Sequence, residues 1–243
     1  MARRQPSASA GAVPPGGRGA VPPGRRAASS TFDAVVLAGG RGTRLGGADK
    51  PGIRLGTTTL VGAVVCAAID AGAQRVILVG PPRPALLPLA ARAPGGLLVV
   101  REDPPGCGPV PALRCGVAQV GEPWVSVLAA DLPFLRGEHL TALLTAAARA
   151  PAGGRNAAAG AGAVLVDDEG LPQWLVGCWQ TGSLRSALGS YSGESLRGLL
   201  LPLRPVRAAW EAVCGQPPPW LDCDTPADLS HARDWHAQWA GPG

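Results

Sequence analysis

Residues 32–51 contain the feature that most constrains the fold, a short apolar run that stops abruptly in a glycine-rich loop. The run reads FDAVVLA over residues 32–38, and Gly39 and Gly40 follow it directly. A continuous apolar run of this length, without polar alternation, is typical of a strand buried on both faces of a parallel sheet. We therefore expect a parallel sheet with a glycine-rich loop at the carboxyl end of this strand.

The remainder of the first half repeats this pattern, with apolar runs separated by segments of helical periodicity. Strands are predicted at 75–79, 97–100 and 124–130, and helices at 57–72, 84–93, 108–120 and 137–150. Such alternation implies an α/β fold, with a parallel sheet covered by helices on both faces. Ligands of these sheets bind beyond the carboxyl ends of the strands. The glycine loop, Asp103 and Asp131 all follow predicted strands and so fall at that edge.

The second half begins after a Gly/Ala-rich connector at 151–160 and is less regular. Two strands are predicted at 161–170 and 171–179, around an Asp-Asp-Glu-Gly turn. Short helices follow at 182–188 and 194–201, then a strand at 203–208. A last helix is predicted from Pro226 to about residue 239, because Thr225 can cap it and proline is favoured at its first position.

The positive charge of the chain is concentrated at its N-terminus. The formal net charge is +5, and five of the 22 basic residues are arginines within residues 1–31, which contain no acid; 17 basic and 17 acidic residues remain. This Pro/Gly/Ala-rich segment has too few large apolar side chains to fold. We predict a disordered basic tail at 1–31 and one folded domain at 32–240. Nucleic-acid binding by the tail is the less favoured alternative.

The cysteines and histidines exclude several classes of site. The six cysteines form no CxxC pair, and there are only three histidines, so no zinc motif is present.

No apolar run is long enough for a membrane span, and the N-terminus lacks the apolar region of a secretory signal. We expect a cytoplasmic protein with reduced cysteines and no membrane association.

The glycine loop carries the first chemical signal. Lys50, at its end, is the only lysine of the chain, which otherwise uses arginine as its basic residue. A site that keeps lysine needs a compact point charge rather than a planar fork. The loop matches neither GxxxxGK[ST] nor GxGxxG. Its backbone N–H groups can still form an anion nest, with Arg44 and Lys50 adding charge for a triphosphate. The alternative is a glycine-rich turn.

Acidic residues that follow a predicted strand or precede the last predicted helix supply the second chemical signal. Asp131 follows an apolar strand, where it can hold Mg²⁺ together with phosphate oxygens or simply cap a helix. Asp222 and Asp224 lie on one face of an extended segment and form a second candidate pair, although Asp224 can also cap the last helix. Four further polar residues either line a groove for the acceptor substrate or are solvated surface residues: Gln173, Glu194, Ser195 and Arg197.

These residues carry a family resemblance. The stretch LAGGRGTRLGGADKP at 37–51 resembles the signature of the molybdenum cofactor guanylyltransferases, which combines LAGG, a small residue, R-M-G and D-K. The resemblance extends to RED before Gly108-Pro109, to AADLPFL at 129–135 and to DCDTPADL at 222–229, and it covers about residues 32–240.

The resemblance implies a three-layer, Rossmann-like nucleotidyltransferase fold with a mostly parallel central sheet. It implies a nucleotide-binding half at 32–150 and an acceptor-binding half at 151–240. The implied reaction transfers GMP from GTP to molybdopterin or its molybdenum form, with Mg²⁺ as cofactor and release of diphosphate. Molybdoenzymes or cofactor-biosynthesis proteins are the implied protein partners.

By the same resemblance, individual positions acquire expected roles. The GTP-binding positions are Leu37, Ala38, Gly39, Gly40, Lys50, Asp103 and Asp131. Together with the charge and acidic-pair arguments above, this predicts that Lys50, Asp131 and Arg44 are catalytic, and that Asp131 and Asp224 bind the metal. Two alternatives stay open: a related transferase that uses CTP or another phosphorylated acceptor, such as a sugar phosphate or 2-phospholactate, and a nucleotide-binding protein without catalysis.

Overall fold

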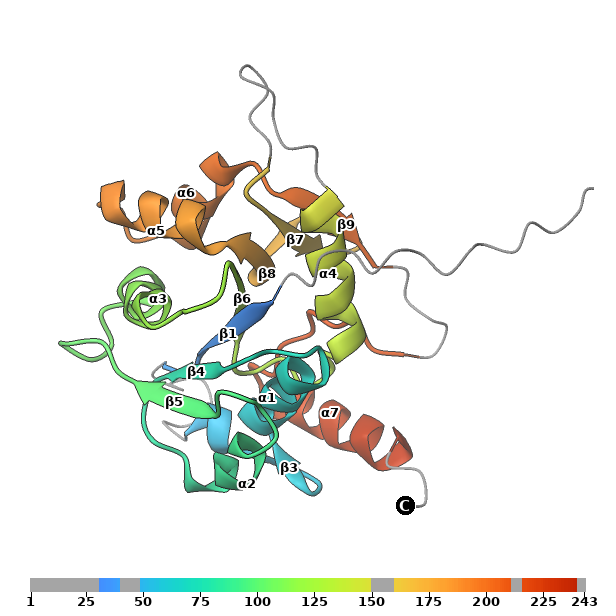
Figure 1. Ribbon diagram of the computed structural model, residues 1–243. Helices are drawn as coiled ribbons and strands as arrows, with labels where there is room; N and C mark the ends of the chain where they lie inside the picture. The colour runs from blue at the N-terminus through green and yellow to red at the C-terminus, as the bar shows by residue number, and fades with distance from the viewer. Residues whose placement is uncertain (1–30, 40–48, 150–159, 211–215, 240–243) are drawn as a thin grey trace, which may run out of the picture.

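The computed structural model describes residues 31–39, 49–149, 160–210 and 216–239. Its centre is a seven-stranded sheet with the order β5-β4-β1-β6-β8-β7-β9 (Figure 1). The pairs within β5-β4-β1-β6 are parallel, β8 runs antiparallel to β6 and β7, and β9 is parallel to β7. The strands are β1 Phe32–Leu37, β4 Val76–Val79, β5 Leu97–Val100, β6 Trp124–Ala129, β7 Gly162–Val166, β8 Pro172–Gln180 and β9 Val206–Ala209.

Helices cover both faces of this sheet and make three layers (Figure 1). Helices α1 (Leu60–Asp70), α2 (Leu87–Ala90) and α4 (Gly137–Arg149) lie on one face. Helices α3 (Pro109–Ala118), α5 (Thr181–Ser190) and α6 (Leu196–Leu200) lie on the other. Because successive side chains of a strand point to opposite faces, β1 supplies Ala34 and Val36 to the first core and Val35 and Leu37 to the second. The predicted α/β fold is confirmed.

Helix α7 (Pro226–Trp239) packs against the start of α1 and the segment before it through a third, smaller cluster. The predicted Thr225 cap is present and is reciprocal: Asp228 N donates to Thr225 Oγ1 at 3.2 Å, and Thr225 N donates to Asp228 Oδ2 at 2.7 Å. The cluster joins buried Leu229 of α7 to Leu55 and Leu60. This packing places the segment before α7, with Asp224, beside the first helix of the chain.

Two predicted helices differ in extent from the observed ones. The helix predicted at 57–72 is α1, but it begins at Leu60 and is capped by Thr59, whose Oγ1 accepts from Gly62 N at 3.1 Å. The two preceding short strands, β2 (Arg54–Leu55) and β3 (Thr58–Thr59), form a hairpin instead. The helix expected at 84–93 is a 3-10 turn, η3 (Pro84–Leu86), followed by the four-residue α2. Two further 3-10 turns are η2 (Lys50–Gly52) and η4 (Leu201–Leu203).

Some predictions concern residues outside the described ranges. These are the disordered tail, apart from Thr31, and the connector, apart from Gly160. The seven-stranded sheet draws strands from both predicted halves of the domain, four from 32–150 and three from 151–240. Among the helices in the described ranges, none has both the length and the apolar character needed to cross a bilayer.

Candidate functional site

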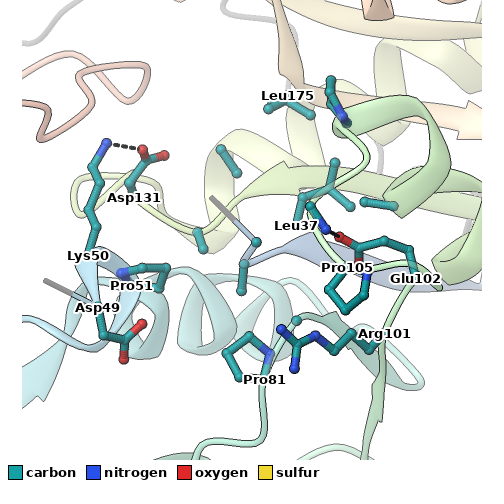
Figure 2. Close-up of a pocket in the computed structure, with 18 of the residues that line it drawn as sticks. Leu37, Asp49, Lys50, Pro51, Pro81, Arg101, Glu102, Pro105, Asp131 and Leu175 are labelled. Carbon is teal, nitrogen blue, oxygen red and sulfur yellow. Dashed lines mark hydrogen bonds and ion pairs between the residues drawn. The ribbon is translucent and has the colours of Figure 1, made fainter. Parts of the chain in front are cut away.

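A cavity of about 930 Å³ opens at the carboxyl ends of the parallel strands (Figure 2). Its walls come from the residues that directly follow four neighbouring strands. Strand register explains this convergence, because Leu37 of β1 pairs with both Val79 of β4 and Ala129 of β6, and Val79 pairs with Val100 of β5. All four strands therefore end at the same level. Leu37, Ala38 and Gly39 line the cavity, in the positions predicted for nucleotide binding.

Lys50 brings together two of the predicted acids. Its Nζ donates to Asp131 Oδ2, from the loop after β6, and to Asp224 Oδ1, from the segment before α7. All three residues line the cavity, and Figure 2 shows the Lys50 side chain directed at Asp131. The Lys50 side chain is only 14% exposed. Burial acts to lower the pKa of Lys50, but the hydrogen bonds and charges of the two carboxylates outweigh it and raise that pKa.

Asp222 completes the acidic surroundings of this lysine. Burial raises the pKa of Asp222, and the negative charges of Asp224 and Asp131 raise it further. Asp224 contacts Lys50, whereas Thr225 caps α7. The position between Asp131 and Asp224 is thus a cation position, held here by an ammonium group.

The same donor set fits Mg²⁺. This ion is commonly bound through one or two carboxylates together with phosphate oxygens and waters. Asp131 and Asp224 supply two carboxylates from different segments around one cation position. The described residues contain no group of three or more His, Cys, Asp or Glu arranged to hold a metal alone. The donors therefore fit a metal that arrives with a phosphate ligand.

The acidic residue that reaches the cavity after β5 is Glu102 rather than Asp103. Glu102 Oε1 accepts from Gly106 N at 2.9 Å, while its buried Oε2 has no hydrogen-bond partner among the described residues. Figure 2 shows Glu102 across the cavity from Lys50. Asp103 is exposed and is not one of the cavity-lining residues. Its contact with the nucleotide stays a prediction, and Glu102 is a site residue that sequence reasoning missed.

A second ion pair at the cavity was also missed. Arg83, in the loop after β4, donates both terminal nitrogens to Asp49, the residue before Lys50. Both residues line the cavity. No motif marked Arg83 in the sequence, since arginine is common throughout this chain.

The other candidate residues divide into three groups. Gly40 and Arg44 lie outside the described residues. Gln173 Nε2 donates to Asp167 Oδ2 at 2.8 Å, and Ser195 Oγ accepts from Gly198 N at 3.0 Å to cap α6, so both serve local structure. The remaining two, Glu194 and Arg197, are exposed. The second half contributes Leu175 and Asp224 to the cavity instead.

Solved structures with this architecture include several nucleotidyltransferases. A nucleotidyl transferase from Methanothermobacter thermautotrophicus is 22% identical with a TM-score of 0.61, covering 86% of this chain and 99% of its own. Rv0371c from Mycobacterium tuberculosis H37Rv is 24% identical with a TM-score of 0.60, covering 85% and 100%. The 2-C-methyl-D-erythritol 4-phosphate cytidylyltransferase of Thermus thermophilus is 18% identical with a TM-score of 0.57, covering 85% and 99%.

At these identities the structural matches establish the fold. No curated protein matches the sequence significantly. The family assignment comes from the sequence itself, because residues 34–212 match the MobA-like NTP transferase domain. With more than half of the chain matched and a cavity formed where such sheets bind ligands, the chain belongs to the family of MobA-like NTP transferase domains and is a nucleotidyltransferase.

Proposed function

We propose that this chain transfers GMP from GTP to molybdopterin or its molybdenum form, releases diphosphate and forms the guanine dinucleotide cofactor. The observation that carries the proposal is the position of Lys50. The only lysine of the chain lies at a cavity on the carboxyl edge of the sheet, in contact with two acids. The resemblance of residues 37–51 to the guanylyltransferase signature supports the choice of nucleotide and acceptor.

The reaction is an in-line substitution at phosphorus. A terminal phosphate oxygen of the acceptor attacks the α-phosphorus of GTP, a new oxygen–phosphorus bond forms, and the bond to the β-phosphate oxygen breaks. The acceptor phosphate is already ionised, so no side chain has to remove a proton. Lys50 lies at the cavity, and its ammonium neutralises charge on the triphosphate once Mg²⁺ takes the position between Asp131 and Asp224. Mg²⁺ bound through Asp131 and Asp224 would supply a Lewis acid for the phosphate oxygens.

Glu102 supports guanine as the base. A carboxylate accepts hydrogen bonds only, and Glu102 Oε2 has no partner within the described part of the chain. Guanine presents two adjacent donors, its N1–H and its 2-amino group, whereas cytosine presents only the 4-amino group. Oε2 is buried, so a turn of the carboxylate that brings it to the cavity would let the two Glu102 oxygens match the guanine pair. We expect Glu102→Gln, which replaces an acceptor by a donor, to reduce the preference for GTP over CTP.

A related transferase that uses CTP is the second candidate, because the fold is shared with the Thermus cytidylyltransferase. Another phosphorylated acceptor, such as a sugar phosphate or 2-phospholactate, belongs to the same alternative. A cytoplasmic location and protein partners that make or use the cofactor stay predictions.

One assay separates these functions. Purified protein is incubated with Mg²⁺, molybdopterin and either GTP, CTP or ATP, and both diphosphate and the dinucleotide adduct are measured. We expect both products with GTP, and their loss in Lys50→Ala and Asp131→Ala. A matched control is Asp70→Ala, which removes a carboxylate that pairs with Arg92 on the protein surface. Products with CTP alone would support the second candidate, and nucleotide binding without either product would support a non-catalytic protein. Full diphosphate release by both site variants would refute the proposal.

A further inference from the structure

Arg83 makes a two-point ion pair with Asp49. Arg83 Nη2 donates to Asp49 Oδ1 at 2.6 Å, and Nη1 donates to Asp49 Oδ2. The Arg83 side chain is only 7% exposed, whereas that of Asp49 is 61% exposed. The hydrogen bonds from Arg83 hold the pKa of Asp49 below its ordinary value, against the opposing effect of burial. Two parallel hydrogen bonds fix the orientation of a carboxylate, which the single ammonium of lysine cannot do.

This pair fixes the backbone that carries Lys50. Asp49 directly precedes Lys50, and Asp49 O accepts from Gly52 N at 2.9 Å across the turn η2. Pro51, inside that turn, is buried. Three interactions therefore fix the start of η2: the hydrogen bonds from Arg83 to Asp49, the hydrogen bond across the turn, and the packing of Pro51. A lysine side chain has a flexible four-carbon stem, so the backbone position sets how often its ammonium reaches the triphosphate.

Gly52 gives independent evidence that the chain makes room for this pair. A Cβ at position 52 would lie 2.4 Å from Asp49 Oδ2 and 3.1 Å from Arg83 Nη1. Both are closer than ordinary carbon contacts, so any side chain at this position would displace the carboxylate from the guanidinium. The ion pair, the glycine and the turn therefore form one unit.

The unit also joins two walls of the cavity. Arg83 belongs to the loop after β4, and Asp49 directly precedes the turn η2. We propose that Arg83 is a positioning residue that acts through Asp49 to hold Lys50 at the triphosphate-binding position. This inference rests on the proposed function, because it takes from it the role of Lys50 in nucleotide binding.

The test is a double-mutant cycle between Arg83 and Lys50. GTP binding with Mg²⁺ is measured by titration calorimetry for wild type, Arg83→Met, Lys50→Met and the double variant. Arg83→Met should weaken GTP binding about tenfold or more, in line with the cost of misplacing a site group. In the Lys50→Met background the same change should alter binding less than about twofold, because no ammonium is left to position. An equal loss in both backgrounds would overturn the inference.

Additional variants separate positioning from folding. Arg83→Lys keeps the charge but loses the fork, and Gly52→Ala keeps both partners but displaces them; each should raise KM for GTP or lower kcat/KM about tenfold. Arg92→Met is the matched control, because Arg92 pairs with Asp70 at 2.7 Å on the surface. It should leave GTP binding unchanged, and urea unfolding of each variant reports stability separately. Wild-type kinetics in both Arg83→Lys and Gly52→Ala would overturn the inference.

The two proposals fail in different ways. If Lys50→Met leaves GTP binding and diphosphate release unchanged, Lys50 has no role in the reaction and the proposed function fails, with this inference. If Lys50→Met is impaired while Arg83→Met behaves as wild type, only the positioning role of Arg83 fails.

Discussion

His139, in the first turn of α4, is a buried histidine whose protonation should destabilise the fold. It is 4% exposed, and its ring lies edge-on to Trp210, with centroids 4.3 Å apart and an interplanar angle of 89°. Its Nδ1 accepts a hydrogen bond from Arg136 N at 2.9 Å. A protonated Nδ1 cannot accept, so protonation would break this bond and place a cation beside Arg136. The bond also closes the loop that begins at Asp131.

The size of the effect follows from the pKa of this group. Burial, and secondarily the charge of Arg136, lowers the pKa of His139 from 6.5 to about 4. As the pH falls below 6.5, the unfolded chain binds a proton that the folded chain does not bind until about pH 4. The free energy of unfolding therefore decreases with falling pH across this window. Between about pH 7 and 4.5 the expected loss from this single group is about 2 kcal/mol.

Urea unfolding at several pH values measures this loss. In His139→Asn, Oδ1 takes roughly the place of Nδ1 and can accept from Arg136 N, but the side chain no longer titrates in this range. The wild type should lose about 2 kcal/mol more stability than His139→Asn between about pH 7 and 4.5. His231→Asn is the control, since His231 is exposed on α7. Parallel stability profiles of wild type and His139→Asn would refute the reasoning.

Two other predictions follow from close contacts. Gly116→Ala would place its Cβ within 2.7 Å of valine side chains on β1 and β4, and should lower the free energy of unfolding by about 1–3 kcal/mol. Gly182→Ala, whose Cβ meets nothing within 4 Å, should be neutral or stabilising, and similar urea curves for both would contradict the packing argument. Lys50→Met removes the ammonium from between Asp131 and Asp224, and should tighten nucleotide-free Mn²⁺ binding about tenfold or more. Paramagnetic resonance of free Mn²⁺ measures this, and unchanged or weaker binding would contradict the shared cation position.

The central strands could be predicted because burial on both faces leaves a direct trace in the sequence. Every residue of β1 and β4 is buried, and each appears as a short apolar run. The hairpin β2–β3 leaves no such trace, since its strands have two residues each. The segment 84–93 has helical periodicity, but Pro88 lacks an N–H group and is favoured only in a first turn. The helix α2 accordingly begins at Leu87, after a 3-10 turn.

The site could be predicted where one residue type stood out in the sequence. It could not be predicted where two nearby acids were equally good candidates for one position. Lys50 and Asp131 were identified as separate candidates, and the structure brings them together. Asp222 and Asp224 share a face of an extended segment, so the sequence could not decide which one meets the lysine. Glu102 and Asp103 differ by one position at a strand end, a distinction finer than sequence patterns resolve. The partner of Asp49 is 34 residues away in the sequence, at Arg83.

The site depends on sheet register as much as on the glycine loop. Gly80, directly after β4, has φ of +152°, and a Cβ there would lie 2.9 Å from the Ala38 carbonyl oxygen. Glycine at this position therefore lets the loops after β1 and β4 approach, and pairing of β1 with β6 brings Asp131 to the same edge. The charges at the cavity come from segments far apart in the sequence, those of Lys50, Asp131 and Asp224. A chain that kept the glycine loop but shifted β6 by one residue would turn Asp131 to the other face of the sheet and separate it from Lys50.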